Sequence, residues 1–261
     1  MTPIRPIHEA AAKGFERGAA DYEKGRPGYP ATAIDVLVRE CGIDERTRVV
    51  DIGAGTGKFT AFVLDHTADI VAVEPVAAMR AAFSARFPDI PVIDGTAEDL
   101  GLPDHSADVA TVAQAFHWFD HGVALDEISR VVRPGGWLAL IWNTRDLDVP
   151  WLAQINDVME GLAGDAPRFR SDDETWHASI DDHPAFGPLG SAVFDNAVGG
   201  MDLEAMRARV ASTSYVSALP DAEREVVLQS VERIVRAGPM ADEGPVFTER
   251  YRTELFWCRR T

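Results

Sequence analysis

The stretch Val49-Val50-Asp51-Ile52-Gly53-Ala54-Gly55-Thr56-Gly57 decides the fold, because a short apolar run with an acid leads directly into three alternating glycines. The following residues, Lys58 to Leu64, are typical of the first turns of a helix. Glycines at a strand-to-helix turn bring backbone N–H groups and the helix N-terminus close to a ligand, since no Cβ stands in the way. The stretch therefore predicts a ligand-binding turn, and a tight turn without a ligand is the alternative.

Spacing excludes two familiar glycine loops. A P-loop has four residues between its first glycine and its Gly-Lys pair, whereas three separate Gly53 from Gly57, and Phe59 stands where Ser or Thr is needed. The dinucleotide fingerprint needs a third glycine three places after the second, and counting from Gly55 that place is Lys58. The acid-x-Gly-x-Gly-x-Gly pattern instead resembles motif I of the class I S-adenosylmethionine (SAM) methyltransferases.

A second acid lies at the distance expected for a nucleoside site. Asp69 to Pro75 is a short apolar run, typical of a buried parallel strand, and it ends at Glu74. An acid about twenty residues beyond the glycine turn can accept hydrogen bonds from both ribose hydroxyls. Nicotinamide and SAM enzymes share this device, so Glu74 predicts a nucleoside without choosing between them, and a helix N-cap is its alternative role.

The resemblance extends over most of the chain. Pro91 to Leu100 is similar to the third strand and adenine turn of the family, Ala107 to Gln114 to its fourth strand, and Arg133 to Leu140 to its fifth. Other segments resemble trans-aconitate-type small-molecule enzymes of the type-11 set, which is related to the ubiquinone-biosynthesis methyltransferases. These segments are Ala113 to Phe119 and the upstream Phe15, Tyr22, Arg26, Pro27, Tyr29 and Pro30.

Strand-like runs alternate with helical ones, which predicts a doubly wound α/β sheet. The resemblance implies seven mostly parallel strands in a Rossmann-like fold with an antiparallel last strand, Val246 to Arg259. A helix is expected over 31–41, ended by Gly42. Amphipathic helices are expected over 201–217 and 221–237, the latter with one apolar face that carries Val226, Val227, Leu228, Val231, Ile234 and Val235.

One methyltransferase domain is expected over 1–261. Its segments are an N-terminal flap and helix (1–45), a SAM-binding core (46–142), an insertion or lid (143–190), and C-terminal helices with the last strand (191–261).

The resemblance implies a SAM site at the C-terminal ends of the strands. The aminoacyl end lies on the glycine turn, Asp51 holds a water or the amino group, Glu74 takes the ribose, and Tyr22 and Arg26 fold over the site or form an ordinary packed flap. The full set of cofactor residues implied is Tyr22, Arg26, Asp51, Gly53, Ala54, Gly55, Gly57, Glu74, Pro75, Met79, Thr96, Ala97, Glu98, Gln114 and Ala115.

The methyl acceptor is expected beside the fourth strand. His117 acts there as a general base or orients the acceptor, or else bonds neighbouring backbone. Phe116 and Trp118 supply apolar wall or core, and Tyr29 completes the substrate set. Arg26 can meet a carboxylate bidentately, so the possible reaction is methylation of a carboxylate oxygen on a small molecule. A SAM- or nucleoside-binding protein without catalysis and a nicotinamide-dependent oxidoreductase are the alternatives.

Composition narrows the partners. The formal net charge of −17 repels phosphate backbones, so nucleic acid is not expected as a partner. No apolar run approaches the length of a membrane span, and the first residues carry no apolar signal core, so a cytoplasmic location is expected. Two isolated cysteines, Cys41 and Cys258, give neither a disulfide framework nor a metal site, and both are expected to be packing residues. The sequence leaves the oligomeric state open.

Overall fold

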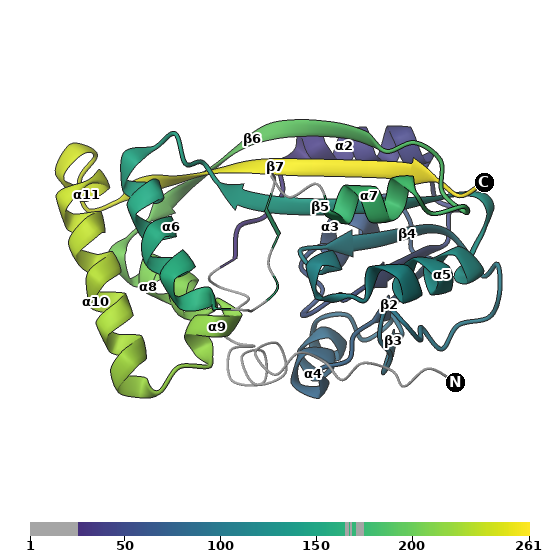
Figure 1. Cartoon of the computed structure of the whole chain (residues 1–261), viewed down its shortest axis with the longest axis horizontal. Coiled ribbons are helices and arrows are strands. Elements are labelled where there is room, and N and C mark those ends of the chain that lie inside the picture. The colour runs from purple at the N-terminus through teal and green to yellow at the C-terminus, as the bar shows by residue number, and fades with distance from the viewer. Residues whose placement is uncertain (1–25, 165–166, 168, 171–174) are drawn as a thin grey trace.

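The computed structural model describes residues 26–164, 167, 169–170 and 175–261. In this part of the chain, seven strands form one sheet in the order β3-β2-β1-β4-β5-β7-β6 (Figure 1). β7 runs antiparallel to both of its neighbours, and the pairs among β1 to β5 are parallel. The predicted seven-stranded doubly wound fold is thereby confirmed. The strands are Val49–Ile52 (β1), Ile70–Val73 (β2), Val92–Ile93 (β3), Ala107–Ala113 (β4), Val132–Arg145 (β5), Gly190–Met201 (β6) and Phe247–Arg259 (β7).

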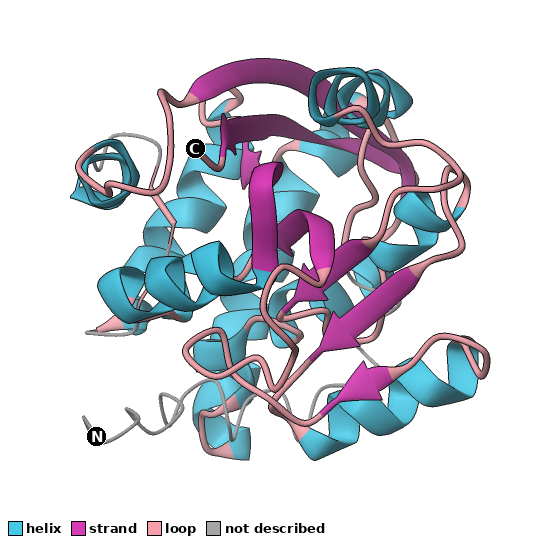
Figure 2. Ribbon diagram, turned by 90° about the vertical axis from the view of Figure 1, so that its right-hand side faces the viewer, coloured by secondary structure: helices cyan, strands magenta, loops and turns pink. Residues whose placement is uncertain are grey.

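Helices cover both faces of the sheet (Figure 2). Helices α2 (Ala31–Cys41), α3 (Thr60–Leu64) and α4 (Ala77–Arg86) pack on the face that receives Val49. Helices α5 (His121–Val131) and α7 (Thr175–Asp181) pack on the other face, which receives Val50. Because both faces are covered, successive residues of β1 and β2 are all buried, which explains their continuous apolar runs.

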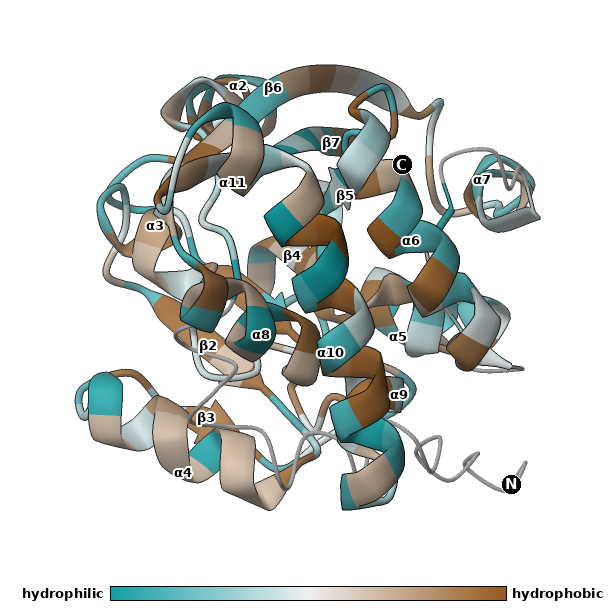
Figure 3. Ribbon diagram, turned by 90° about the vertical axis from the view of Figure 1, so that its left-hand side faces the viewer, coloured by the Kyte–Doolittle hydropathy of each residue, from teal (hydrophilic) through white to brown (hydrophobic). Residues whose placement is uncertain are grey.

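A helical cap stands at one end of the sheet, beside the outer strands (Figures 1 and 3). It consists of α6 (Pro150–Ala163), α8 (Leu203–Ala211), α9 (Ser214–Ser217), α10 (Asp221–Ala237) and α11 (Pro239–Asp242). The cap has its own apolar cluster, which includes Val231 of α10 and Phe247 at the start of β7. The segment 143–190, expected as an insertion or lid, is divided: α6 joins the cap, whereas α7 covers the sheet.

Two helix predictions need correction. The helix expected over 201–217 is broken into α8 and α9 at Ser212 and Thr213. Val226, expected on the apolar face of α10, is 63% exposed, because the buried face is formed by Val227, Leu228, Val231 and Val235. The end of α2 is as predicted, since Gly42 has φ +64° and its N–H donates to the carbonyl of Val38.

Cys41 and Cys258 are both buried and free, and burial raises the pKa of each thiol to about 12. Every described helix is too short or too polar to cross a lipid bilayer.

Candidate active site

The glycine turn follows β1 directly and lies close to its neighbours. Gly53, Gly55 and Gly57 have φ values of +68°, +58° and +79°, a region that L side chains rarely adopt. A Cβ on Gly53 would come within 2.8 Å of the Ala115 side chain, and one on Gly57 within 2.5 Å of Phe87. Backbone conformation and close approach therefore both require glycine here.

Asp51 lies below this turn, 1% exposed. Its two carboxylate oxygens accept hydrogen bonds from the hydroxyls of Thr60 at 2.6 Å and Thr111 at 3.0 Å. Burial raises the pKa of Asp51 to about 6, although the two hydroxyl donors oppose the rise. The sequence-predicted acid is thus held rigidly at the floor of the turn by one residue from α3 and one from β4.

Glu74 follows β2 and reaches back to the same turn. Its carboxylate accepts a hydrogen bond from the N–H of Gly55 and another from the N–H of Val76, both at 2.9 Å. Burial raises the pKa of Glu74, and these two N–H donors oppose the rise. A carboxylate has about four lone-pair positions, so two stay available for hydroxyl donors of a ligand.

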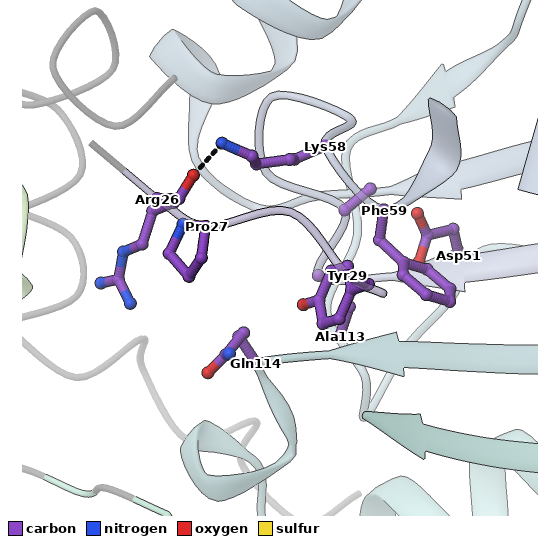
Figure 4. Close-up of a pocket in the computed structure, with 10 residues that line it drawn as sticks. Arg26, Pro27, Tyr29, Asp51, Lys58, Phe59, Ala113 and Gln114 are labelled. Atoms are coloured by element: carbon purple, nitrogen blue, oxygen red, sulfur yellow. Dashed lines mark hydrogen bonds between the residues drawn. The ribbon is translucent and has the colours of Figure 1, made fainter. Parts of the chain in front are cut away.

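A strap, residues 26–30, crosses this region and closes a small pocket, here called the glycine-loop pocket (Figure 4). The Lys58 ammonium donates to the carbonyl of Arg26. The carbonyl of Gly28 accepts from Asn143 Nδ2 at 3.1 Å and from Asn196 Nδ2 at 2.9 Å, which ties the strap to β5 and β6. The pocket is lined by Arg26, Pro27, Tyr29, Asp51, Gly53, Ala54, Lys58, Phe59, Ala113 and Gln114.

Tyr29 belongs to this pocket and not to the cavity beside His117, where it was expected to bind substrate. Its ring packs edge-on against Phe59 at 5.3 Å and Phe62 at 5.8 Å, so it anchors the strap on α3. Tyr22, a predicted cofactor residue, lies outside the described residues.

The expected adenine turn follows β3. Backbone N–H groups of Thr96 and Asp99 each donate to the other's carbonyl, at 3.1 and 3.2 Å, and Ala97 is buried. The Glu98 carboxylate accepts from the N–H of Asp120 at 2.8 Å. Met79 on α4 is buried, and Pro75 is half-buried beside Glu74. The Thr96 hydroxyl is buried without a hydrogen-bond partner among the described residues, which is uncommon in a folded protein.

Gln114 ends β4 in a strained conformation, with φ +60° at a residue other than glycine. Its N–H donates to the carbonyl of Ile141 at 2.9 Å, and its side-chain amide donates to the carbonyl of Asn143 at 3.3 Å. In Figure 4 the ends of the Gln114 and Arg26 side chains point away from Asp51. Both residues also line a second cavity.

This second cavity, here called the His117 pocket, has a volume of about 180 Å³ and lies between the sheet edge and the helical cap. Arg26 and Gln114 line both pockets, so the two cavities adjoin there. The lining of the His117 pocket is Arg26, Gln114, His117, Trp118, Asn143, Thr144, Arg145, Asn156, Glu160, Pro167, Phe169, Arg209, Thr213, Ser214 and Tyr215.

His117 lies on the short 3-10 helix η1 (Phe116–Trp118), and its Nδ1 is 3.4 Å from the indole Nε1 of Trp142. An indole N–H can only donate, so Nδ1 accepts and the ring proton of a neutral His117 sits on Nε2. Burial, followed by the positive charge of Arg26, lowers the pKa of His117 to about 3. His117 is therefore neutral near pH 7 and presents an N–H donor rather than a base.

The two aromatic neighbours of His117 play different structural parts. Trp118 lines the His117 pocket. Phe116 is fully buried, stacked on His121 with ring centroids 4.6 Å apart, so it supports the pocket from the core and does not face an acceptor. In the structure, Trp118 therefore lies in the wall of this cavity and Phe116 lies in the core.

The sequence did not point to nine polar residues that line the His117 pocket, among them Asn143, Arg145, Arg209 and Tyr215. Asn143 and Arg145 follow the apolar run of the fifth strand, so the strand-end rule could have found them. Arg209 and Tyr215 belong to the cap, and no spacing in the sequence shows that α8 and α9 return to this sheet edge.

The residues present fit an adenosyl cofactor. The glycine turn leaves no room for a Cβ at two positions, a buried carboxylate with spare lone pairs stands at the adjacent strand end, and an orphaned hydroxyl follows the next strand. Among the described residues, no group of His, Cys, Asp and Glu side chains could hold a metal ion.

Known proteins are similar to this chain in sequence. Residues 50–140 match the sequence family described as methyltransferase domain. An uncharacterised methyltransferase-like protein of Schizosaccharomyces pombe is 34% identical over 245 residues, which cover 94% of each chain.

Solved structures show the same fold. A proposed type II methyltransferase from Anaeromyxobacter dehalogenans has a TM-score of 0.62 at 24% identity, covering 90% of this chain and 97% of the other. A geranyl diphosphate C-methyltransferase from Streptomyces coelicolor, solved with Mg²⁺, geranyl diphosphate and S-adenosylhomocysteine, has a TM-score of 0.50 at 14% identity, covering 88% and 79%. Because the similarity to the Schizosaccharomyces pombe protein extends over nearly the whole of both chains, this chain belongs to the class I methyltransferase family.

Proposed function

We propose that this protein transfers the methyl group of SAM to a carboxylate oxygen of a small molecule bound in the His117 pocket. The observation that carries the proposal is the meeting of two cavities at Arg26 and Gln114. One cavity lies on the glycine turn, where the family binds its cofactor, and the other opens toward the cap. A donor in the first and an acceptor in the second would face each other across these two side chains.

The cofactor site is assigned to the glycine turn and the two strand ends beside it. Glu74 takes the ribose hydroxyls on its remaining lone pairs, and Asp51 orients the amino end of the cofactor. The bound SAM supplies a sulfonium methyl that is already activated, so the chain has to align the acceptor and exclude water. The S. coelicolor neighbour, which holds S-adenosylhomocysteine, supports this choice of cofactor.

The chain's own contribution is alignment. The strap places the Arg26 guanidinium at the junction of the pockets, where it can hold a carboxylate through two parallel N–H donors. Trp118 and Phe169 form an apolar side of the His117 pocket. The ring of Phe169 is stacked on that of Trp142, with the ring centroids 4.1 Å apart. These rings exclude water from the path of the methyl group.

The state of His117 favours a carboxylate over other acceptors. A phenol or an amine needs a base to remove its proton, whereas a carboxylate is already ionised at neutral pH. His117 lines the pocket, and its ring proton is on Nε2 because its Nδ1 accepts from the indole N–H of Trp142. A donor at this position orients an anionic oxygen.

The cofactor assignment is tested by calorimetry with Glu74→Ala. We expect SAM binding to weaken by about 1–3 kcal/mol, because hydrogen bonds to a charged acceptor are lost. The matched control is Glu40→Ala, which removes a partly exposed acid of α2 that pairs with Arg39. Equal affinity in wild type and Glu74→Ala would remove Glu74 from the site.

The acceptor assignment is tested with methyl-labelled SAM and a panel of small organic acids, phenols and amines. A carboxyl methyl ester releases its label as methanol in mild alkali, whereas methyl groups on nitrogen, carbon or phenolic oxygen stay attached. We expect alkali-labile product and activity that is nearly flat between about pH 6 and 9.

His117→Ala is expected to keep SAM binding and lose less than about tenfold in turnover. A loss of about 10² or more indicates general-base chemistry and refutes the carboxylate. SAM binding without turnover on any acceptor class points to a binding protein.

A further inference from the structure

The cap side of the His117 pocket carries more positive charge than the rest of the molecule suggests. Arg145 at the end of β5 and Arg209 on α8 line it together with Arg26. Glu160 is the one acidic residue among its described lining, and it lies 4.0 Å from Arg170. The whole chain has a formal net charge of −17, so this local excess of arginine runs against the composition.

Arg145 is held in place but incompletely hydrogen-bonded. Its side chain is 10% exposed, and its Nε lies 3.5 Å from a carboxylate oxygen of the buried Glu249. Its Nε and Nη2 have no hydrogen-bond partner among the described residues. Burying a cation without full hydrogen bonding is costly, so an anion that completes these bonds would be bound favourably.

Arg209 is buried beside it, 5% exposed. Its Nε donates to the phenolic oxygen of Tyr251 at 2.9 Å, and its guanidinium lies over the same ring, 5.7 Å from the centroid. These contacts fix the guanidinium in one orientation. Tyr215 stands close to both arginines: burial raises the pKa of its phenol, and Arg145, Arg26 and Arg209 oppose the rise. Tyr215 stays protonated and can donate to the same anion.

We infer that Arg145 and Arg209, with Tyr215, form an anion subsite that holds a second negatively charged group of the acceptor, a carboxylate or a phosphate. This inference rests on the proposed methyl transfer and extends it. Arg26 at the junction of the pockets would hold the carboxylate that is methylated, and the subsite under the cap would hold the group that is not. The acceptor would then be at least a dianion, and its methylated product would keep a negative charge.

The subsite can be tested without knowing the acceptor, by using inorganic phosphate and acetate as probes. Each anion is titrated by calorimetry into full-length protein saturated with S-adenosylhomocysteine, with chloride holding the ionic strength constant. Constant ionic strength and matched variants are needed because phosphate also stabilises proteins non-specifically. We expect saturable binding of at least one probe to wild type, and the tighter probe identifies the preferred group.

Arg145→Met is expected to weaken that binding at least about tenfold, because a charge-assisted pair of hydrogen bonds is lost. Arg39→Met, which removes an exposed arginine of α2, is expected to bind as wild type does. Arg145→Met leaves Glu249 buried without its cation, so the double variant Arg145→Met/Glu249→Gln is made in parallel to keep the fold. Binding of S-adenosylhomocysteine by each variant reports an intact fold.

The outcomes separate the subsite from the reaction. If neither anion binds wild type saturably, or if both bind the Arg145 variants as they bind wild type, the subsite is refuted. If anion binding depends on Arg145 but no organic acid is methylated, the subsite stands and the carboxylate reaction fails. If monocarboxylates and dicarboxylates are methylated with the same KM, and Arg145→Met changes neither value, the reaction stands and the subsite fails.

Discussion

His117 and Asp51 line adjoining cavities, and burial moves their pKa values in opposite senses. The pKa of His117 falls to about 3 and that of Asp51 rises to about 6, since burial favours the neutral form of each group. At the scale of the residue, the environment therefore decides the chemistry. The sequence left His117 open as a general base, an orienting group or a histidine bonded to backbone, whereas in the structure the indole N–H of Trp142 donates to its Nδ1.

His117 should make the protein less stable in mild acid. Unfolded His117 takes up a proton below about pH 6.5, whereas folded His117 does so only near pH 3, so stability present at pH 7 is lost as the pH falls through this window. We expect His117→Gln to lose up to about 2 kcal/mol less than wild type between pH 7 and pH 5. Urea unfolding at both pH values measures the difference, and equal losses would contradict the lowered pKa.

Two glycines with similar φ values should differ in their tolerance of alanine. Gly57→Ala places a Cβ 2.5 Å from Phe87, whereas Gly42→Ala meets nothing within 4 Å. Both substitutions cost about 1–2 kcal/mol for the left-handed conformation, and Gly57→Ala costs about 1–3 kcal/mol more for overpacking. Urea unfolding of the two variants isolates the steric part. A Gly57→Ala variant as stable as Gly42→Ala would show that Phe87 moves aside freely.

At the scale of the element, apolar periodicity predicted those strands and helices whose burial is continuous or strictly one-sided. β1, β2 and α2 could be predicted from the sequence because the pattern of apolar residues in each element shows which of its side chains are buried. Arg145 and Arg209 are 64 positions apart (209 − 145) in the chain, and only the packing of the cap brings them to one cavity. The residues around the glycine turn could therefore be predicted from motifs, whereas the cap side of the His117 pocket is assembled by tertiary contacts that leave no local pattern in the sequence.

Helix α10 offers a matched pair for its buried and exposed faces. Val231 is fully buried in the cap cluster, and Val226 is 63% exposed. We expect Val231→Ala to destabilise the protein by about 2 kcal/mol through lost burial and a new cavity, and Val226→Ala by less than about 0.5 kcal/mol. Equal effects in chemical denaturation would mean that α10 is rotated relative to the structure.

At the scale of the whole molecule, the net charge of −17 opposes compaction through self-repulsion. The repulsion is long-range, so it depends on salt, unlike the buried contacts of the two pockets. The His117 pocket differs in charge from the chain as a whole, because its described lining holds Arg26, Arg145 and Arg209 against Glu160 alone.

Salt should accordingly stabilise the fold near neutral pH. Raising NaCl from about 0.02 to 0.2 M shortens the screening length from about 20 Å to about 7 Å, and we expect the Tm to rise by a few degrees at pH 7.5. At pH 5, close to the sequence pI of 4.7, the same addition should shift the Tm much less. Differential scanning calorimetry at both pH values makes the comparison. A salt effect that is as large at pH 5 would indicate specific ion binding instead of charge screening.

The place of β7 in the sheet has a consequence for synthesis. β7 pairs with β5 from Trp137 to Arg145 and with β6 from Gly190 to Met201, so it lies between two strands that precede it in the chain. When residues up to the end of α11 have left the ribosome during synthesis, β5 and β6 are already outside it, whereas β7, which lies between them in the sheet, is not. During that interval β5 and β6 each present an unpaired edge to each other and to other nascent chains. The order of synthesis therefore matters to this sheet, because the two neighbours of β7 exist before the strand that joins them.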